Sequence, residues 1–326
     1  VLSSKADGTR LWVSVPLNGE DPSGATIYGV MATSQTANDG VGLQHIDRYG
    51  RVITLTTTDF DAHASFGGDT AFDEYTDGDS NVFCKIPIAY WWRGNINGKW
   101  CMLISDQPGT YAGKTFTASP GAFLQDGVWM DQFYIGKYRG HDAGDSKIGS
   151  KSGQTHLGNV SFNDWRTYCA NVGTGYHLLS LFEWHEILAR MVVEKATFQL
   201  IPEASRTTAG SCVYRGITDF AYSGTVYAEW MDGVRTDASG KWELWDEADG
   251  TYISSGVACP EYSGSNYYPP SVSAHFPYLF LGGGACVAIA AAWIPDLNGR
   301  ASGYVSRICY SDFSAGSARH GARCQR

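Results

Sequence analysis

The sequence predicts an α+β fold that is rich in loops, with two main helices and short antiparallel strands, preceded by a small, mainly-β N-terminal module. Three observations predict this class. Two segments combine a helix start signal with apolar residues at helical spacing. Short β-prone runs elsewhere are separated by Gly and Asp clusters. The 326 residues are 43% apolar and only 17% charged, a composition that favours a packed core over disorder.

Charge and hydropathy limit the classes of partner. The formal net charge is -9 at pH 7, so we expect no nucleic-acid partner. No stretch approaches the ~18 consecutive apolar residues of a membrane span, and the first residues are too polar for a signal peptide, so we expect no membrane insertion. The chain begins at Val1 rather than Met, as a processed or trimmed chain would, so its start does not identify a compartment.

Residues 1–80 are expected to form the N-terminal module. Its β-prone runs lie at 11–15, 26–31 and 52–57, with turn residues between them. The polar, acidic segment 73–81 has the composition of a linker. A domain boundary is therefore predicted near residue 80.

The second predicted domain, residues 81–326, begins with a hairpin. Residues 83–92 and 100–104 have the composition of strands, and Gly and Asn in 94–98 favour the turn between them. Further strands are expected at 224–230 and 278–281.

The first predicted helix covers residues 161–172. Ser161 is the expected N-cap, because its hydroxyl can accept a hydrogen bond from an unpaired backbone amide of the first turn. An apolar stripe that includes Trp165 follows, and Gly173 ends the helix. We therefore expect Trp165 to belong to the core.

The second predicted helix covers residues 181–194. Ser180 and Glu183 have capping-box spacing ahead of an apolar run that starts at Trp184. Glu186 is expected on a polar flank of this helix, without an acid–base role. Both helices would then serve as scaffold.

The cysteines and histidines suggest no metal centre. The eight cysteines are dispersed without a Cys-x-x-Cys pair, so a zinc site is not expected. Buried free thiols and one or two disulfides remain alternative interpretations. The histidines lack metal-binding spacing, and Asp296 and Asn298 fit an ordinary turn better than a Ca²⁺ site. We expect no obligatory metal and no cofactor.

Several aromatic motifs of the second domain occur in a recognisable order. Residues 160–169 read Val-Ser-Phe-Asn-Asp-Trp-Arg-Thr-Tyr-Cys, and 175–184 read Gly-Tyr-His-Leu-Leu-Ser-Leu-Phe-Glu-Trp. With four further segments, this series resembles the formylglycine-generating-enzyme-like (sulfatase-modifying factor) branch of the C-type lectin fold. The further segments are 133–138, 226–232, 282–284 and 321–323. The family motif has Arg at the position of His177 and Pro at that of Leu179. The resemblance implies a C-type lectin fold for the second domain.

The chemistry of that family depends on copper. In the enzymes that the chain resembles, two cysteines five residues apart near the C-terminus bind copper, because soft thiolates hold Cu(I). Here Cys309 and Cys324 are fifteen residues apart, and no closer pair follows. We therefore expect a protein that is not an enzyme. An oxidase of the formylglycine-generating type with unusual cysteines is the alternative.

The C-terminal tail has an unusual composition. The chain contains 9 Lys, 10 Glu, 8 Gln and 5 Met, yet none lies in 262–324, where about six would be expected by proportion. No codon that ends in a pyrimidine encodes these four residue types. The tail resembles the variable region of diversity-generating retroelement proteins, such as phage tropism determinants and related archaeal-virus proteins, in which randomised Asn-type codons end in a pyrimidine. That resemblance implies a variable region at about 282–324. A buried strand of small residues is the other interpretation of 282–292.

The resemblance also implies which positions vary and bind ligand. Aligning the family pattern at Gly282-Gly283 and at 321–323 gives the variable positions near the two ends of the region. The positions in the middle are chosen because they alternate with small residues. The expected ligand-binding positions are Gly284, Cys286, Val287, Ala288, Ala290, Arg300, Gly303, Tyr304, Arg307, Tyr310, Ser317, Arg319 and His320. Aromatic and guanidinium groups among them are of the kind that anchors protein interfaces.

These expectations define a function class. The sequence predicts a hypervariable ligand- or receptor-binding protein on a virion or cell surface, whose loops present diversified side chains on a rigid scaffold. Its partner would be a protein or glycan receptor on a host or neighbouring cell, and analogy with tail fibres suggests a homo-oligomer. An invariant structural tail protein is a further alternative.

Overall fold

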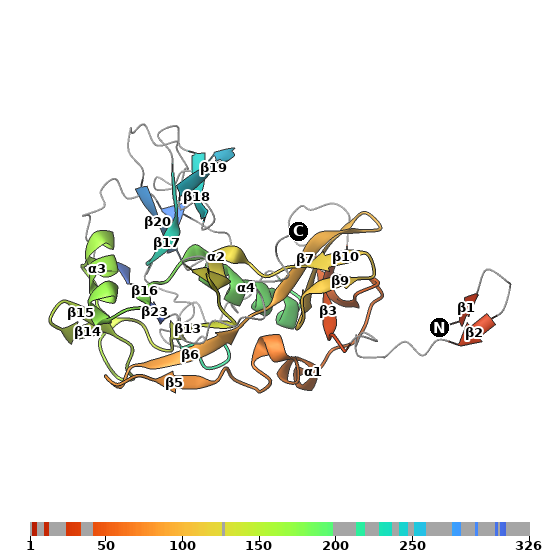
Figure 1. Ribbon diagram of the computed structural model, residues 1–326, viewed down its shortest axis with the longest axis horizontal. Coiled ribbons are helices and arrows are strands. Elements are labelled where there is room, and N and C mark those ends of the chain that lie inside the picture. Colours follow the sequence, from red (N-terminus) through yellow and green to blue (C-terminus); the bar gives the residue numbers. More distant parts are fainter. Residues whose placement is uncertain are drawn as a thin grey trace.

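The fold is mixed α/β, with mostly antiparallel strands and few helices in the part of the chain described, as the predicted α+β class requires (Figure 1). The structure is a computed structural model. It describes residues 2–4, 10–12, 24–33, 42–125, 128–197, 213–218, 228–236, 241–246, 251–258, 276–281, 291–292, 304–305 and 307–310.

Three strands were predicted in the N-terminal region. Of the run at 11–15, Leu11 and Trp12 lie in β2 (Arg10–Trp12), and residues 13–15 lie outside the described residues. The other two runs have opposite outcomes. The run at 26–31 is confirmed as β3 (Ile27–Ala32). The run at 52–57 is not a strand, because Asp59 accepts a hydrogen bond from the amide of Thr56 at 2.7 Å and starts the short helix α1 (Thr57–Asp61). A local cap therefore outweighed the β propensity of these threonines.

A four-stranded antiparallel sheet joins strands from both sides of the predicted boundary. β3 pairs with β8, so the N-terminal region and the hairpin share one sheet. In spatial order its strands are β4 (Leu43–Asp47), β3, β8 (Lys99–Ser105) and β7 (Tyr90–Ile96).

The boundary predicted near residue 80 does not separate two cores. Phe60 and Phe66 lie in the same hydrophobic cluster as Trp91 and Ile187. The segment 73–81, expected to be a linker, contributes β5 (Glu74–Thr76), which pairs with β6 (Val82–Pro87). Acidic composition misled the prediction, because all three residues of the edge strand β5 are exposed, so a paired strand can have the polar composition of a linker.

The predicted hairpin is confirmed as β7 and β8, with a shorter turn. Asn97 and Gly98 have φ angles of 52° and 77°, the left-handed conformation that a two-residue type I′ turn needs. The predicted strand 83–92 is two strands, β6 and β7, which belong to different sheets. The chain changes sheet at Ile88 and Ala89.

A five-stranded antiparallel sheet lies on the other side of the molecule's long helix (Figure 1). Its strands, in spatial order, are β16 (Tyr176–Leu178), β23 (Ile308–Tyr310), β13 (Gln132–Gly136), β6 and β5. β23 comes from the C-terminal tail and is inserted between β16 and β13. The tail is therefore part of the scaffold at this point.

The two long helices begin where their caps predict. α3 (Phe162–Val172) follows Ser161, whose hydroxyl accepts a hydrogen bond from the Asp164 amide at 3.1 Å. α4 (Leu181–Lys195) follows Ser180 and has the predicted capping box.

α4 occupies the space between the two sheets. Ile187 and Met191 share one core cluster with Ile104 of the four-stranded sheet and Ile135 of the five-stranded sheet. Glu186, expected on a polar flank, is fully buried; it accepts hydrogen bonds from the Trp91 indole and forms an ion pair with Arg190. The flank prediction was wrong because Arg190 and Trp91 satisfy the buried carboxylate.

A third sheet contains the strands that the sequence placed near 224–230 and 278–281. Its order is β19 (Thr251–Ala258), β18 (Lys241–Asp246), β17 (Ala228–Thr236), β20 (Phe276–Leu281) and β21 (Ala291–Ala292), with β22 (Tyr304–Val305) parallel to β17.

The remaining elements are short. They are β1 (Leu2–Ser4), β2 (Arg10–Trp12), η1 (Ala64–Phe66), β9 (Gly109–Tyr111), β10 (Lys114–Phe116), α2 (Pro120–Phe123), β11 (Leu124–Gln125), β12 (Val128–Trp129), β14 (His141–Gly144) and β15 (Lys147–Gly149).

Four cysteines lie within the described residues. They are free and buried, which confirms the free-thiol interpretation for these four: Cys84, Cys101, Cys169 and Cys309. Burial raises the pKa of Cys84 to about 12, so its thiol is protonated at neutral pH.

Candidate functional site

Ten of the thirteen predicted ligand-binding positions lie outside the described residues. They are Gly284, Cys286, Val287, Ala288, Ala290, Arg300, Gly303, Ser317, Arg319 and His320. The other three, Tyr304, Arg307 and Tyr310, lie in the described part of the tail.

Two of these three belong to strands. Tyr304 is in β22, where its backbone lies opposite Ala228 of β17. Tyr310 is in β23, where its backbone lies between Tyr134 of β13 and Tyr176 of β16. The structure therefore places both positions in paired strands rather than in free loops.

Arg307 is not a surface anchor. Its side chain is fully buried, and its guanidinium donates to the carbonyl oxygens of Gly136 at 3.2 Å and Thr218 at 2.7 Å. Its own carbonyl accepts from the Leu179 amide at 3.2 Å. The expectation that Arg307 faces a ligand is corrected, because its guanidinium lies inside the protein, where it donates to backbone carbonyl groups.

A segment between α4 and the tail, residues 213–218, contacts both Arg307 and α4. In residues 213–218, Thr218 donates its amide to the Lys137 carbonyl at 2.9 Å and accepts from Arg307. Arg215 donates from Nε and Nη2 to Glu194 of α4 at 3.0 Å. The segment therefore connects the tail to α4.

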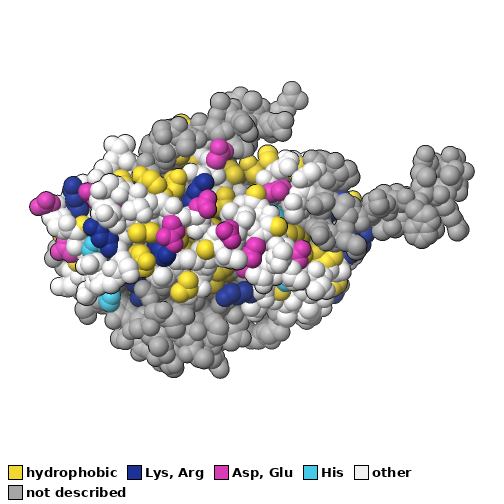
Figure 2. Space-filling model, turned by 90° about the horizontal axis from the view of Figure 1, so that it is seen from below, with side chains coloured by type: hydrophobic (Ala, Val, Ile, Leu, Met, Phe, Trp, Pro, Cys, Tyr) yellow, Lys and Arg dark blue, Asp and Glu magenta, His cyan; other side chains and the backbone are white. Residues whose placement is uncertain are grey.

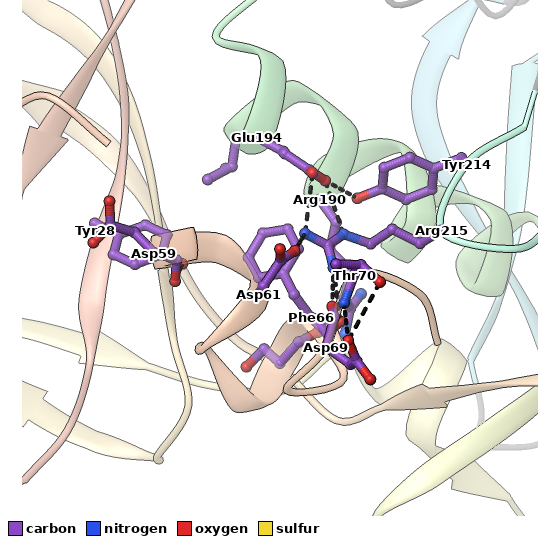
Figure 3. A network of polar contacts seen from close by, with 12 residues as sticks. Tyr28, Asp59, Asp61, Phe66, Asp69, Thr70, Arg190, Glu194, Tyr214 and Arg215 are labelled. Atoms are coloured by element: carbon purple, nitrogen blue, oxygen red, sulfur yellow. Dashed lines mark hydrogen bonds and ion pairs between the residues drawn. The ribbon is translucent and has the colours of Figure 1, made fainter. Parts of the chain in front are cut away.

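Figure 3 shows the polar network that holds this segment. Arg215 also pairs with Asp61 at 3.0 Å and donates to the Asp69 carbonyl at 2.6 Å, while Tyr214 donates to Glu194 at 2.9 Å. The side chain of Arg215 is 3% exposed, so these contacts are screened little by solvent. Three separate parts of the chain are joined here, and none of these residues is left free for a ligand by the contacts described.

Another cluster lies where β23 meets β16 and the start of α4. Cys309 and His177 are directly opposite each other in the antiparallel register, so their side chains share one face of the sheet. Glu183 lies in the first turn of α4, and its Oε1 is 2.8 Å from His177 Nε2. Within the described part of the chain, these three residues form the one group that could hold a metal, with ligand atoms within 4.8 Å of one another.

Charge within this cluster alters the protonation of its members. Although burial alone would lower the pKa of His177, the Glu183 carboxylate raises it to about 9, with a smaller contribution from Asp232. Burial, and then Glu183, raises the pKa of the Cys309 thiol well above its usual value. At neutral pH the His177 imidazole and the Cys309 thiol are therefore both protonated.

The sequence alone does not indicate this cluster. In the sequence, His177 is a departure from a family motif, Glu183 is a helix-capping residue, and Cys309 is one of several dispersed cysteines. Strand pairing between distant segments brings the three together, and no local spacing encodes that pairing. The capping box was the one available signal, since it fixed where Glu183 lies.

The described surface gives little support to a polyanion as partner. Figure 2 shows acidic and basic side chains interspersed with apolar ones on one face of the molecule. Of the helices within the described residues, none has the length and hydropathy to cross a membrane.

No protein-family model and no curated protein matches this chain.

Proposed function

We propose that the chain is a hypervariable ligand- or receptor-binding protein with a C-type lectin fold, displayed on a virion or cell surface and not an enzyme. The observation that carries the proposal is the absence of Lys, Glu, Gln and Met from residues 262–324. Randomised codons that end in a pyrimidine produce this deficit, whereas an ordinary surface segment contains these residues.

The contacts of the tail support the proposal. Arg307 and Cys309 are fully buried, and backbone pairs attach β23 to strands on both sides. A binding surface can be diversified only where the supporting chain is fixed. An anchor at 307–310 leaves 282–304 and 311–324 as the segments that would carry variable side chains.

The proposed partner is a protein or glycan receptor on a host or neighbouring cell, and the chain would act as a homo-oligomer. Tyr304 and Arg319 belong to the residue types that anchor interfaces. With 17% charged residues and a net charge of -9, the chain is better suited to bind a protein or glycan surface than to bind a polyanion.

The alternatives differ in the experiment that would support them. A formylglycine-generating-type oxidase would turn over a peptidyl cysteine in the presence of copper, and a structural tail protein would assemble without binding a receptor. No described contact favours either of them.

The proposal is tested with the labelled full chain on cells from the community in which the gene occurs. A triple variant, Ser317→Ala with Arg319→Ala and His320→Ala, should keep its Tm and lose most cell binding. A control with Asn163→Ala and Thr167→Ala, on the exposed side of α3, should keep both. Equal cell binding by the triple variant and the control would contradict the proposal.

A further inference from the structure

The cluster of His177, Glu183 and Cys309 has the donor set of a zinc site. An imidazole nitrogen, a carboxylate oxygen and a sulfur are the three ligand types that Zn²⁺ uses in proteins. Their ligand atoms already lie within 4.8 Å of one another. Tetrahedral coordination would require only small movements, since Zn–N, Zn–O and Zn–S bonds of about 2.0 to 2.3 Å hold the ligand atoms some 3 to 4 Å apart.

Contacts around the cluster orient each ligand. His177 Nδ1 lies 3.0 Å from the Gly175 carbonyl oxygen, so Nδ1 donates its proton there and Nε2 points at Glu183. Metal-binding histidines have this arrangement, with the second ring nitrogen on a backbone carbonyl. Glu183 Oε2 accepts from the Ser180 amide at 2.7 Å, which leaves Oε1 for an ion.

The third ligand is fixed by the sheet. Cys309 is fully buried, and its backbone is paired with His177 on one side and Ile135 on the other. Glu183 is 1% exposed, while the side chain of His177 is 30% exposed. The His177 side is therefore the side from which an ion can enter from solvent, and water would supply the fourth ligand.

We propose that His177 Nε2, Glu183 Oε1 and Cys309 Sγ bind one Zn²⁺, which fastens the tail strand β23 to β16 and the start of α4. The ion replaces the proton between His177 and Glu183 and the proton of the Cys309 thiol, because zinc ligands bind in their deprotonated forms. In the metal-free protein these protons hold the same three side chains together. The zinc site does not depend on the proposed function.

The site gives the ion a structural role. β23 is three residues long and comes from a tail in which, under the proposed function, neighbouring residues change. A metal ligand on this strand links it to scaffold residues distant in the sequence, so side-chain changes nearby would not detach it. Binding of the ion to the folded state alone would also stabilise that state.

The test measures zinc binding by the full chain after removal of metals with a chelator. Titration against a chromogenic zinc chelator should show one tight site, and Co²⁺ in its place should give a thiolate-to-cobalt charge-transfer band. Cys309→Ala should weaken zinc binding by more than about 100-fold and abolish that band, since even residues that only orient ligands cost 10- to 100-fold.

A matched control separates this site from other thiols. Cys101 is also free and fully buried, but it lies in β8, outside the cluster, so Cys101→Ala should leave zinc affinity and the cobalt band unchanged. His177→Gln, at a partly exposed position, should also weaken binding more than about 100-fold and carries the test if the Cys309 variant does not fold.

Two results would overturn the zinc site. One is a folded wild-type chain that binds no zinc; the other is zinc binding that neither Cys309→Ala nor His177→Gln weakens. Binding of cells by the wild-type chain is a separate readout, so failure of the zinc site and failure of the proposed function are distinguishable.

Discussion

Arg307 is the buried residue through which the tail is attached to the rest of the protein. Its guanidinium donates to the carbonyl oxygens of Gly136 and Thr218, which lie far from it in the chain. Helix caps such as Ser161 and Ser180 act within three or four residues and can be assigned from the sequence, whereas contacts as distant as those of Arg307 cannot.

Substitution of Arg307 should destabilise the fold strongly. Arg307→Ala leaves buried carbonyl groups without donors, and we expect the free energy of unfolding to fall by about 3 kcal/mol. Urea unfolding followed by Trp fluorescence measures the loss. Arg166→Ala, at a side chain that is 57% exposed, is the control and should cost under about 1 kcal/mol. Similar losses in the two variants would argue against the buried role.

His63 should make stability depend on pH. Burial lowers its pKa from 6.5 to about 3, and its Nδ1 accepts a hydrogen bond from the Ser65 amide at 3.2 Å. Between these values the unfolded chain binds more protons than the folded one, so stability is full above pH 6.5 and falls as the pH drops toward 3. We expect a loss of about 2 kcal/mol between pH 7 and pH 5 from this group.

The non-titrating variant His63→Gln isolates this contribution. Its amide can still donate to the Thr26 carbonyl, which lies 3.1 Å from His63 Nε2. The free energy of unfolding of this variant should fall less between pH 7 and pH 5 than that of the wild type. An identical pH dependence in both proteins would rule out His63 as its source.

Among the helices and strands, the features that nearby residues specify were predicted from the sequence, whereas the pairing of strands distant in the sequence was not. The turn at Asn97-Gly98 and the caps of α3 and α4 lie within a few residues of the structure that they specify. The insertion of β23 between β16 and β13 depends on segments that are distant in the sequence. No period or spacing within a short window reports such a contact.

The cap of α3 provides a test at this scale. Ser161→Ala removes the acceptor of the Asp164 amide, and we expect a loss of about 1 kcal/mol in the free energy of unfolding. Thermal unfolding monitored by circular dichroism measures it. Thr167→Ala, at an exposed position within the helix, is the control and should change stability by under about 0.5 kcal/mol. Indistinguishable losses would mean that Ser161 does not act as a cap.

For the whole molecule, composition predicted the class but not the domain plan. The mixed α/β fold with mostly antiparallel strands is compatible with the predicted α+β class, whereas described residues on both sides of the boundary predicted near residue 80 share one sheet and one core cluster. The core around α4 takes side chains from both sides of that boundary, including Phe60, Phe66 and Ile187. Described residues on both sides of position 80 therefore form one core.

A fragment tests that plan. A chain of residues 81–326 lacks β3 and β4 and exposes the apolar partners of Phe60 and Phe66, so we expect no cooperative unfolding transition from it. Near-ultraviolet circular dichroism during heating would detect one. A fragment that unfolds cooperatively at the Tm of the full chain would restore the boundary near residue 80.

Under the proposed function, the side chains of the tail vary between copies of the gene, while the residues at 307–310 that fix the tail do not. Deep sequencing of the 3′ end of the gene and its flanking DNA, across a population of the source organism or virus, tests it most directly. We predict substitutions concentrated at positions such as Cys286, Val287, Arg319 and His320, constant Arg307 and Cys309, a near-identical template repeat and a nearby reverse-transcriptase gene. A uniform tail without such a repeat would contradict the claim.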